Sequence, residues 1–224
     1  DAARALRLGA EGAAQDGLLG FAPAAATTTL TLRLHHGIEA LGASDGAHGT
    51  VARAGSEFGF ARLVAEATRL QPLFEPAEGW LLGLQAAAAA QWSDDVLPPA
   101  EKFYLGGNRL GRGFYAGQVA GDRAVAGSLE LQLGRRTDLA LPGGGSLVLG
   151  TQFYLFRDEG RAFDNGPGGL DRSLASWGGG VRLQFDERLQ LDLEAVRRLT
   201  RNPDGAGAAR LDDTAVFARV LLRF

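Results

Sequence analysis

Hydrophobic and polar residues alternate along most of this chain. Between residues 29 and 40, Leu30, Leu32 and Leu34 share one parity, and the side chains between them are polar. A period of two places successive side chains on opposite faces of a β-strand, so the pattern predicts an all-β protein. The alternation recurs along the chain and predicts about nine strands, near residues 3–15, 27–41, 57–71, 79–92, 122–135, 146–158, 173–186, 188–200 and 213–224.

Strand and loop lengths narrow the fold class. Several predicted strands run to ~10–15 residues, which is longer than usual in globular sheets and suits a tilted membrane crossing. Long polar connections are expected at about 42–56, 94–121, 159–173 and 201–212, alternating with shorter links at about 16–26, 72–79, 134–146 and 186–188. Long loops at one end and tight turns at the other are typical of an antiparallel outer-membrane β-barrel. A soluble β-sandwich also alternates, so the period alone leaves that fold open.

Composition removes several other classes of protein. The chain has no cysteine and a net charge of −3, so neither a disulfide framework nor a nucleic-acid partner is expected. No apolar run reaches the ~20 residues that a membrane helix needs, which excludes a helical membrane protein but leaves a barrel possible. The absence of methionine, with Asp1 opening directly into strand-like sequence, predicts that the chain is a fragment of a longer protein.

Two motifs follow one another in the middle of the chain. The first spans residues 91–132 and holds Gln91, Leu97, Glu101, Phe103, Leu105, Gly106 and Gly107, then Arg112-Gly113-Phe114, then Gly121-Asp122 and Glu130. The second, F-x-D-x-G, runs from Phe156 through Asp158 to Gly160. In this order and spacing the motifs resemble those of the TpsB-type two-partner secretion transporters, also called hemolysin secretion/activation proteins.

This resemblance implies a fold and a function for the whole chain. Residues 1–224 would be the C-terminal part of a transmembrane barrel of roughly sixteen strands, with residues 94–121 folded into the lumen as a loop needed for transport. The protein would export an unfolded TpsA-like partner passively, without enzymatic activity or a cofactor. The family's periplasmic POTRA domains, plug helix and remaining strands lie outside this sequence.

The residues themselves offer a chemical role for Arg112. Glu130 shares its parity with polar neighbours and opposes the leucines of its strand, so it is expected to face the lumen, and Asp158 is placed there by the same reasoning. A guanidinium stays charged and can bond two carboxylates through its planar fork. The competing interpretations are an ordinary loop arginine for Arg112 and generic lumenal polar residues for the two carboxylates.

Glycine and aromatic residues surround Arg112 in the loop. Its glycines would permit tight folding of the backbone, and its aromatic residues, Phe103, Tyr104, Phe114 and Tyr115, would pack it against the inner wall. Gly111 departs from the pattern of the TpsB-type transporters, which usually have an aliphatic or β-branched residue before the arginine. This glycine is expected to make the loop tip more flexible.

Other residues carry weaker expectations. Phe224, in an alternating context, resembles the C-terminal signal by which barrel-assembly machinery recognises its clients. Aromatic residues near strand ends or facing lipid are candidates for interfacial girdles: Trp80, Trp92, Phe153, Tyr154 and Trp177. His35 and His36 are adjacent and should point to opposite faces of a strand, so no metal site is expected.

The predicted barrel also implies certain partners, and several rival functions stay open. A lipid bilayer should surround a monomeric barrel, with lipopolysaccharide as a further contact of the outer loops. The nearest rival function is that of a barrel-assembly insertase of the same superfamily, which shares the R-G-F loop. A passive porin, a barrel enzyme such as a surface lipase and a soluble β-sandwich adhesin are more distant rivals.

Overall fold

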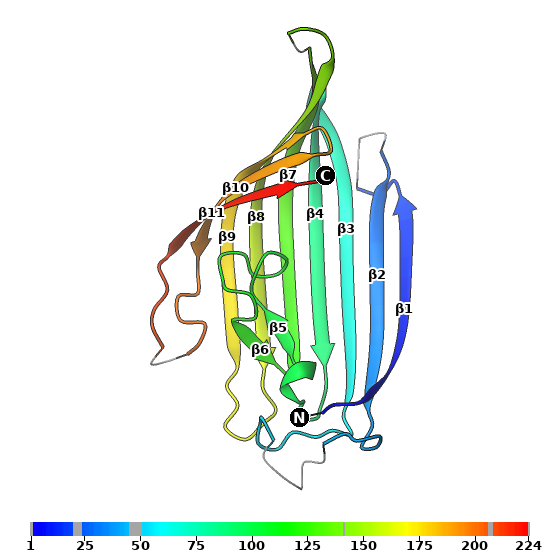
Figure 1. Ribbon diagram of the computed structural model, residues 1–224, viewed down its shortest axis with the longest axis vertical. Coiled ribbons are helices and arrows are strands. Elements are labelled where there is room, and N and C mark those ends of the chain that lie inside the picture. The colour runs from blue at the N-terminus through cyan, green and yellow to red at the C-terminus, as the bar shows by residue number, and fades with distance from the viewer. Residues whose placement is uncertain (1, 20–23, 45–50, 141, 206–207, 224) are drawn as a thin grey trace.

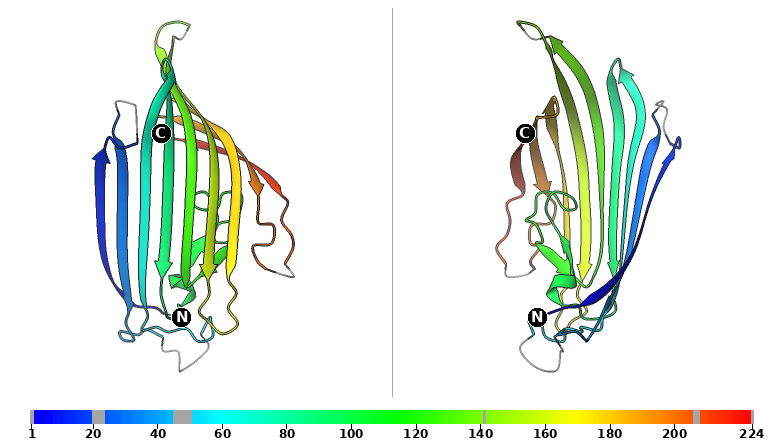
Figure 2. Two further views of the ribbon diagram at one scale, coloured as in Figure 1. Left: turned by 180° about the vertical axis from the view of Figure 1, so that it is seen from behind. Right: turned by 45° about the vertical axis from the view of Figure 1, so that its right-hand side comes forward.

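A single curved antiparallel sheet of nine strands forms the body of the molecule (Figures 1 and 2). The computed structural model describes residues 2–19, 24–44, 51–140, 142–205 and 208–223. Neighbouring strands follow chain order, β1-β2-β3-β4-β7-β8-β9-β10-β11, while β5 and β6 pair separately. The nine are β1 (Ala5–Asp16), β2 (Ala26–Gly37), β3 (Ala61–Ala77), β4 (Trp80–Trp92), β7 (Arg123–Ala140), β8 (Ser146–Phe163), β9 (Arg172–Phe185), β10 (Leu189–Arg198) and β11 (Thr214–Leu222).

The nine predicted strands correspond one to one to these nine, with shifted ends. The third was predicted at 57–71 but occupies 61–77, because the alternating Phe58 and Phe60 lie in a loop where both are buried. This strand continues past Pro72 through register irregularities, where a proline is tolerated. The link predicted at 134–146 is mostly strand, and β8 runs on to Phe163. Among the residues described, no helix has the length and apolar character needed to cross a membrane.

The two faces of the sheet differ in what covers them. On one face, large apolar side chains stand exposed, among them Leu129 and Leu155 at 55% and 61%. We call this the open face. On the other, the covered face, alternate residues of the same strands are buried, among them Glu130 and Asp158. Every β-strand projects successive side chains to opposite sides, so one period-two sequence supplies both faces.

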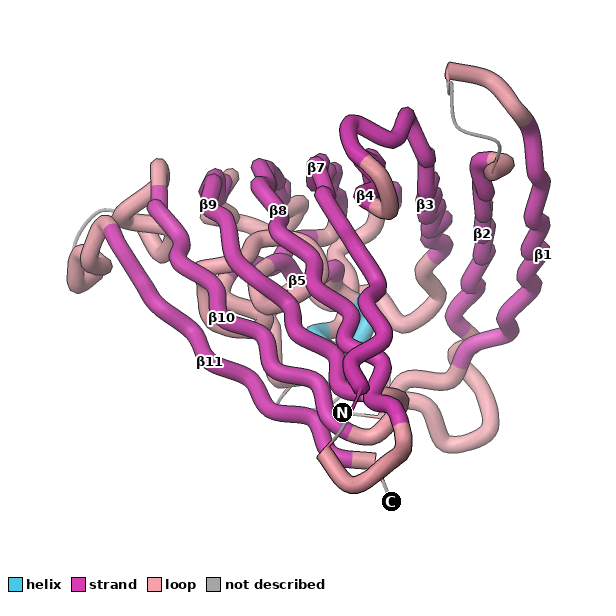
Figure 3. Tube along the Cα trace, turned by 90° about the horizontal axis from the view of Figure 1, so that it is seen from above, coloured by secondary structure: helices cyan, strands magenta, loops and turns pink. Residues whose placement is uncertain are grey.

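The connection between β4 and β7 lies against the covered face (Figure 3). The sequence predicted a loop over 94–121, and the structure adds a 3-10 turn, η1 (Pro99–Glu101), and a short hairpin of β5 (Phe103–Leu105) and β6 (Val119–Gly121). Its apolar side chains pack on small residues of the sheet. The resulting core holds Leu105, Leu110, Phe114 and Val119 from the connection and Ala89, Ala124, Ala126, Ala162 and Leu174 from the strands.

Candidate functional site: an arginine bound to two strands

The Arg112 side chain donates four hydrogen bonds and is only 7% exposed. Its Nε and Nη2 donate to Asp158 Oδ2 and Oδ1 at 3.0 and 2.7 Å, a two-pronged contact that matches the fork of the guanidinium to the carboxylate. Nη1 donates to Glu130 Oε2, and Nη2 also donates to Ser128 Oγ at 2.9 Å. Because Glu130 lies on β7 and Asp158 on β8, one loop side chain joins two neighbouring strands.

Asp158 also binds the backbone of the loop. Its Oδ2 accepts hydrogen bonds from the backbone N–H groups of Gly111 and Arg112 at 3.2 and 2.8 Å. The carboxylate is fully buried, where an unpaired charge would be costly, so these donors together with the guanidinium compensate for its loss of water. Backbone and side chain of the loop tip thus meet at one acidic group.

The other two residues of the F-x-D-x-G motif shape the surface around Asp158. The guanidinium of Arg112 lies 3.5 Å from the centroid of the Phe156 ring, close enough for a cation–π contact. At Gly160, an added Cβ would stand 3.0 Å from Cδ1 of Leu105 and 3.1 Å from Cβ of Ala126. A glycine at this position therefore gives the fully buried Leu105 its place against the sheet.

The remaining motif residues of the loop lie where its backbone turns. Positive φ angles occur at Gly106, Gly107, Gly111 and Gly113. Phe114 is buried in the core that joins the loop to the sheet. Tyr104 and Tyr115, expected to pack inward beside it, are 51% and 71% exposed, so that expectation is wrong. The loop is held by Phe114, Leu105 and Arg112, not by its tyrosines.

Arg112 stays positively charged in this environment. Burial by itself lowers its pKa, but the hydrogen bonds and negative charges of Asp158 and Glu130 outweigh that effect and raise the pKa above its ordinary value. The cation therefore persists throughout the pH range in which proteins work. Any loss of the contact has to come from the carboxylates or from movement of the loop.

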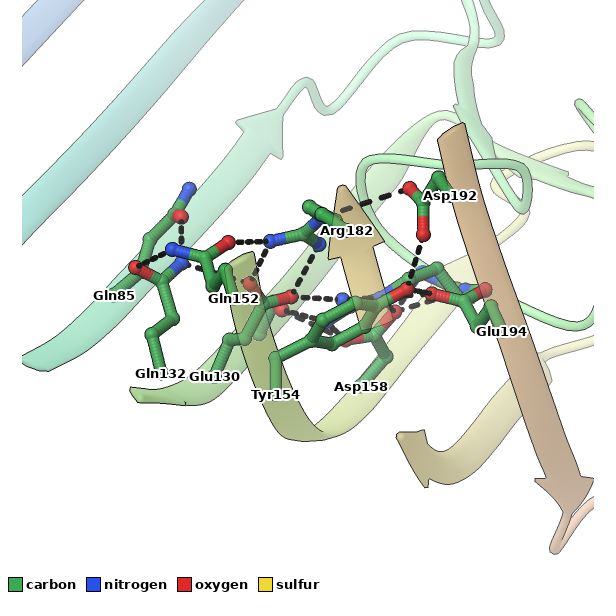
Figure 4. Close-up of polar contacts among 12 residues, drawn as sticks. Gln85, Glu130, Gln132, Gln152, Tyr154, Asp158, Arg182, Asp192 and Glu194 are labelled. Carbon is green, nitrogen blue, oxygen red and sulfur yellow. Dashed lines mark hydrogen bonds and ion pairs between the residues drawn. The ribbon is translucent and has the colours of Figure 1, made fainter. Parts of the chain in front are cut away.

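A second arginine, which the sequence analysis did not single out, supports Glu130 from the sheet (Figure 4). Arg182 on β9 donates through Nη1 and Nη2 to the two carboxylate oxygens of Glu130 at 2.6 and 3.1 Å. Its guanidinium lies 3.8 Å from the ring centroid of Tyr154 and 3.5 Å from Asp192. Glu130 therefore accepts from two arginines, one on the loop and one on the sheet.

Tyr154 belongs to this network and not to an outer aromatic girdle. It is 3% exposed on the covered face, and its hydroxyl lies 2.8 Å from Asp192 Oδ1 and 3.0 Å from Glu194 Oε2. The girdle interpretation is therefore wrong for this residue. In contrast, Phe153 and Trp80 stack on the open face with ring centroids 6.2 Å apart.

The lead-in to the loop has a separate set of anchors. Gln91 Nε2 donates to the backbone oxygens of Glu101 and Asp122, which joins the start and the end of the connection. Arg62 lies 2.6 Å from the buried Glu101 carboxylate. The motif residue Leu97 is fully buried. These residues fix both ends of the loop, while Arg112 fixes its tip.

Asp122, the acid of the Gly-Asp pair, anchors three further segments. Arg53 donates to both of its carboxylate oxygens at 2.6 and 2.7 Å, and the backbone N–H groups of Leu97 and Asn165 donate to it at 3.0 and 2.7 Å. The neighbouring Lys102 has a lowered pKa, because it is partly buried and faces the charge of Arg53. This cluster ties together the long connections at one end of the sheet.

Other residues considered in the sequence lie away from Arg112 or outside the described residues. His35 Nδ1 lies 3.0 Å from Arg62 Nη2, and no group of three metal-ligating side chains occurs within the described part of the chain. Phe224 lies outside the described residues. Arg53, Asp192 and Glu194 belong to no sequence motif. Alternation along a strand could have indicated that Asp192 and Glu194 share a face, but their contacts are visible only in the structure.

Comparison with known proteins relates this architecture to a protein family and to a solved structure. The model of the family described as haemolysin secretion/activation protein ShlB/FhaC/HecB matches residues 19–183. No curated protein sequence matches the chain. Among solved structures, CdiB from Escherichia coli is similar with a TM-score of 0.65 and 21% sequence identity, over 93% of this chain and 34% of CdiB. The nine-stranded sheet thus corresponds to part of the CdiB fold, and this chain spans about a third of its length.

Proposed function

The chain belongs to the haemolysin secretion/activation protein family, ShlB/FhaC/HecB, and on this basis we propose that it forms part of a pore that exports a partner protein. Proteins of this family are transporters of the bacterial outer membrane and not enzymes. The cargo is a secreted, TpsA-like chain that crosses unfolded. Export is passive, and folding of the cargo outside the cell supplies the drive.

In the proposed pore the sheet is the C-terminal part of a closed barrel. β1 and β11 each pair on one side only among the described residues, so each has an edge that can pair with a further strand. Strands outside this sequence would close the barrel there. The open face, with its exposed leucines, would contact lipid, and the covered face would line the lumen.

Within that lumen, Arg112 would hold the loop against the wall. The observation that carries this role is the buried contact of one loop arginine with Asp158 and Glu130 on two adjacent strands. An extracellular loop arginine without such a role would be expected in water, paired loosely or not at all. Arg109, three residues earlier in the same loop, is a contrast: it is 61% exposed, and its ion pair with Glu66 at 3.2 Å is itself partly exposed.

Secretion by the full-length protein tests this role. We expect Arg112→Ala, and a Glu130→Ala/Asp158→Ala double variant, to reduce export of the cognate partner by roughly tenfold or more, because a broken buried ion pair leaves an uncompensated charge. Arg109→Ala is the matched control and should export normally. The amount of each variant in the outer membrane and its heat-dependent mobility on gels show whether the barrel is assembled.

The same experiment separates the rival functions. Normal export by assembled Arg112→Ala would remove the proposed role of the loop and would fit a passive porin. Intact export with defective insertion of other outer-membrane proteins would indicate an assembly insertase. Loss of export with normal assembly of other proteins supports the secretion pore.

A further inference from the structure

A row of two arginines and two aromatic rings crosses the open face where β4 ends and β7 begins. Arg123 lies 5.3 Å from the ring centroid of Trp92 and 5.8 Å from that of Phe163, and Arg161, two residues before Phe163 on β8, lies 5.1 Å from the Phe163 ring centroid. The register pairs Arg123 with Phe163 and Arg161 with Val125, so both guanidiniums occupy the same face of neighbouring strands. Trp92, Arg123 and Phe163 thus form a row across β4, β7 and β8, and Arg161 extends it along β8.

The two positive charges of this row are poorly compensated. Among the described residues, no carboxylate lies within ion-pair distance of Arg123, and its buried Nε has no hydrogen-bond partner. Arg161 approaches Asp171 at only 3.9 Å, with both side chains more than half exposed. In contrast, Arg157 on the same face pairs with Glu159 at 3.0 Å. Two poorly paired guanidiniums on a lipid-facing surface are unfavourable unless an anion lies between them.

An apolar hollow adjoins the row. It has a volume of about 330 Å³ and lies among β3, β4, β7 and β8, and its lining includes Leu63, Ala65, Ala90 and Val125 together with Trp92, Arg123 and Phe163 of the row. The small alanines leave the hollow open, and the surrounding side chains offer almost no polar atoms. A hydrocarbon chain is therefore the chemistry that fits it.

We propose that this part of the open face binds lipopolysaccharide, with a phosphate of its head group between Arg123 and Arg161 and an acyl chain in the hollow. The assignment rests on the orientation of the proposed pore, in which the end of the sheet with the long connections lies outside the cell. At that end the outer leaflet supplies a lipid with both required parts. Guanidinium forks suit phosphate, and basic pockets at membrane interfaces recognise anionic head groups.

Lipid binding by the full-length protein in nanodiscs or mild detergent tests the proposal. Native mass spectrometry would measure binding of bis-phosphorylated lipid A, dephosphorylated lipid A, phosphatidylglycerol and inorganic phosphate. We expect bis-phosphorylated lipid A to bind most tightly. Arg123→Gln/Arg161→Gln should weaken that binding roughly 25-fold, because each arginine near an interface contributes about fivefold and the two effects multiply. Arg157→Gln, on the same face but already paired, is the matched control and should bind like the wild type.

Each other result overturns the proposal. Equal binding of lipid A by the double variant and the wild type would exclude the two arginines. Equal binding of phosphorylated and dephosphorylated lipid A would exclude a phosphate contact, and preference for phosphatidylglycerol would assign the site to a phospholipid. Competition by inorganic phosphate at similar concentration would show that the acyl hollow adds nothing. Neither arginine touches Arg112 or its carboxylates, so failure here leaves the export role of the loop standing.

Discussion

Asp158 and Glu130 both accept from Arg112, but they contribute unequally to holding the loop. Asp158 accepts two bonds from the guanidinium and two from the loop backbone, in addition to one from Ser128. Glu130 accepts one bond from Arg112 and shares its oxygens with Arg182 and Gln132. Loss of Asp158 therefore removes four hydrogen bonds to the loop tip, whereas loss of Glu130 removes one.

This asymmetry predicts different effects for the two isosteric substitutions. We expect Asp158→Asn to lower the free energy of local loop opening by about 3–5 kcal/mol, because it leaves a buried arginine without its main partner. Glu130→Gln should cost about 1–2 kcal/mol, the value of a single hydrogen bond. Hydrogen exchange of the amides of residues 106–117 in the full-length protein measures both. Equal protection in the two variants would contradict the ranking.

Gly111 shows why the residue before Arg112 is not aliphatic here. The TpsB-type transporters usually have an aliphatic or β-branched residue at that place, and a glycine was expected to loosen the loop. The structure gives a different reason for the glycine: its φ is +103°, and an added Cβ would lie 2.7 Å from Cδ1 of Leu174. Left-handed backbone disfavours every residue with a Cβ.

Gly111→Ala should therefore destabilise the loop instead of tightening it. We expect the free energy of local opening to fall by about 1–2 kcal/mol from the backbone alone, and by more if Leu174 has to move. Gly12→Ala is the control, because Gly12 lies in β1 with no atom within 4 Å of an added Cβ. Slower exchange of loop amides in Gly111→Ala than in the wild type would disprove this account.

Among the strands, β7 shows how one element supplies two environments. Leu129 and Leu131 are exposed on the open face, while Ser128 and Glu130, which alternate with them, are buried beneath the loop. β8 repeats the arrangement in register, since Ser128 pairs with Asp158 and Glu130 with Phe156. This register, and not either sequence alone, brings the two acceptors of Arg112 together.

Spin labels on β7 would test the assignment of the two faces. The chain has no cysteine, so single cysteines can be introduced without background. Leu131→Cys should carry a label accessible to oxygen, because it faces hydrocarbon in the proposed pore. Gln132→Cys should carry a label accessible to a polar nickel reagent, because the next residue of a strand faces the lumen. Aqueous accessibility at both positions would rule out a lipid-facing surface.

Taken as a whole, the molecule has two sheet edges and one large apolar face. Leu8 on β1 is 72% exposed, and Val216 on β11 is 80% exposed. Unpaired strand edges and contiguous apolar surface both promote association in water. This exposed surface distinguishes the chain from a soluble sandwich, in which a second sheet would cover the leucines.

The isolated chain of 224 residues should accordingly need detergent. We expect it to aggregate in detergent-free buffer and to remain dispersed in micelles, as size-exclusion chromatography with light scattering would show. The reason is that neither its edges nor its open face are satisfied by water. A monodisperse, folded monomer without detergent would favour the β-sandwich adhesin over a membrane protein.

Local patterns in the sequence were enough to predict an all-β antiparallel fold, its nine long strands and the face to which Glu130 and Asp158 belong. A period of two depends only on neighbouring residues and on the geometry of an extended backbone, so no knowledge of distant contacts was needed. Strand ends were predicted less accurately. Phe58-Gly59-Phe60 alternates like a strand, but its phenylalanines are buried by loop packing, which depends on distant residues.

Apart from Arg112 with Asp158 and Glu130, the side-chain pairs of the site became clear only from the tertiary structure. Arg182 reaches Glu130 across 52 residues, and Arg53 reaches Asp122 across 69, distances along the chain that no local pattern encodes. Such pairs follow from strand register and from the path of the connections, which are set by the packing of the whole sheet. The same holds for Arg123 and Arg161, whose shared ring, Phe163, is defined by the pairing of β7 with β8.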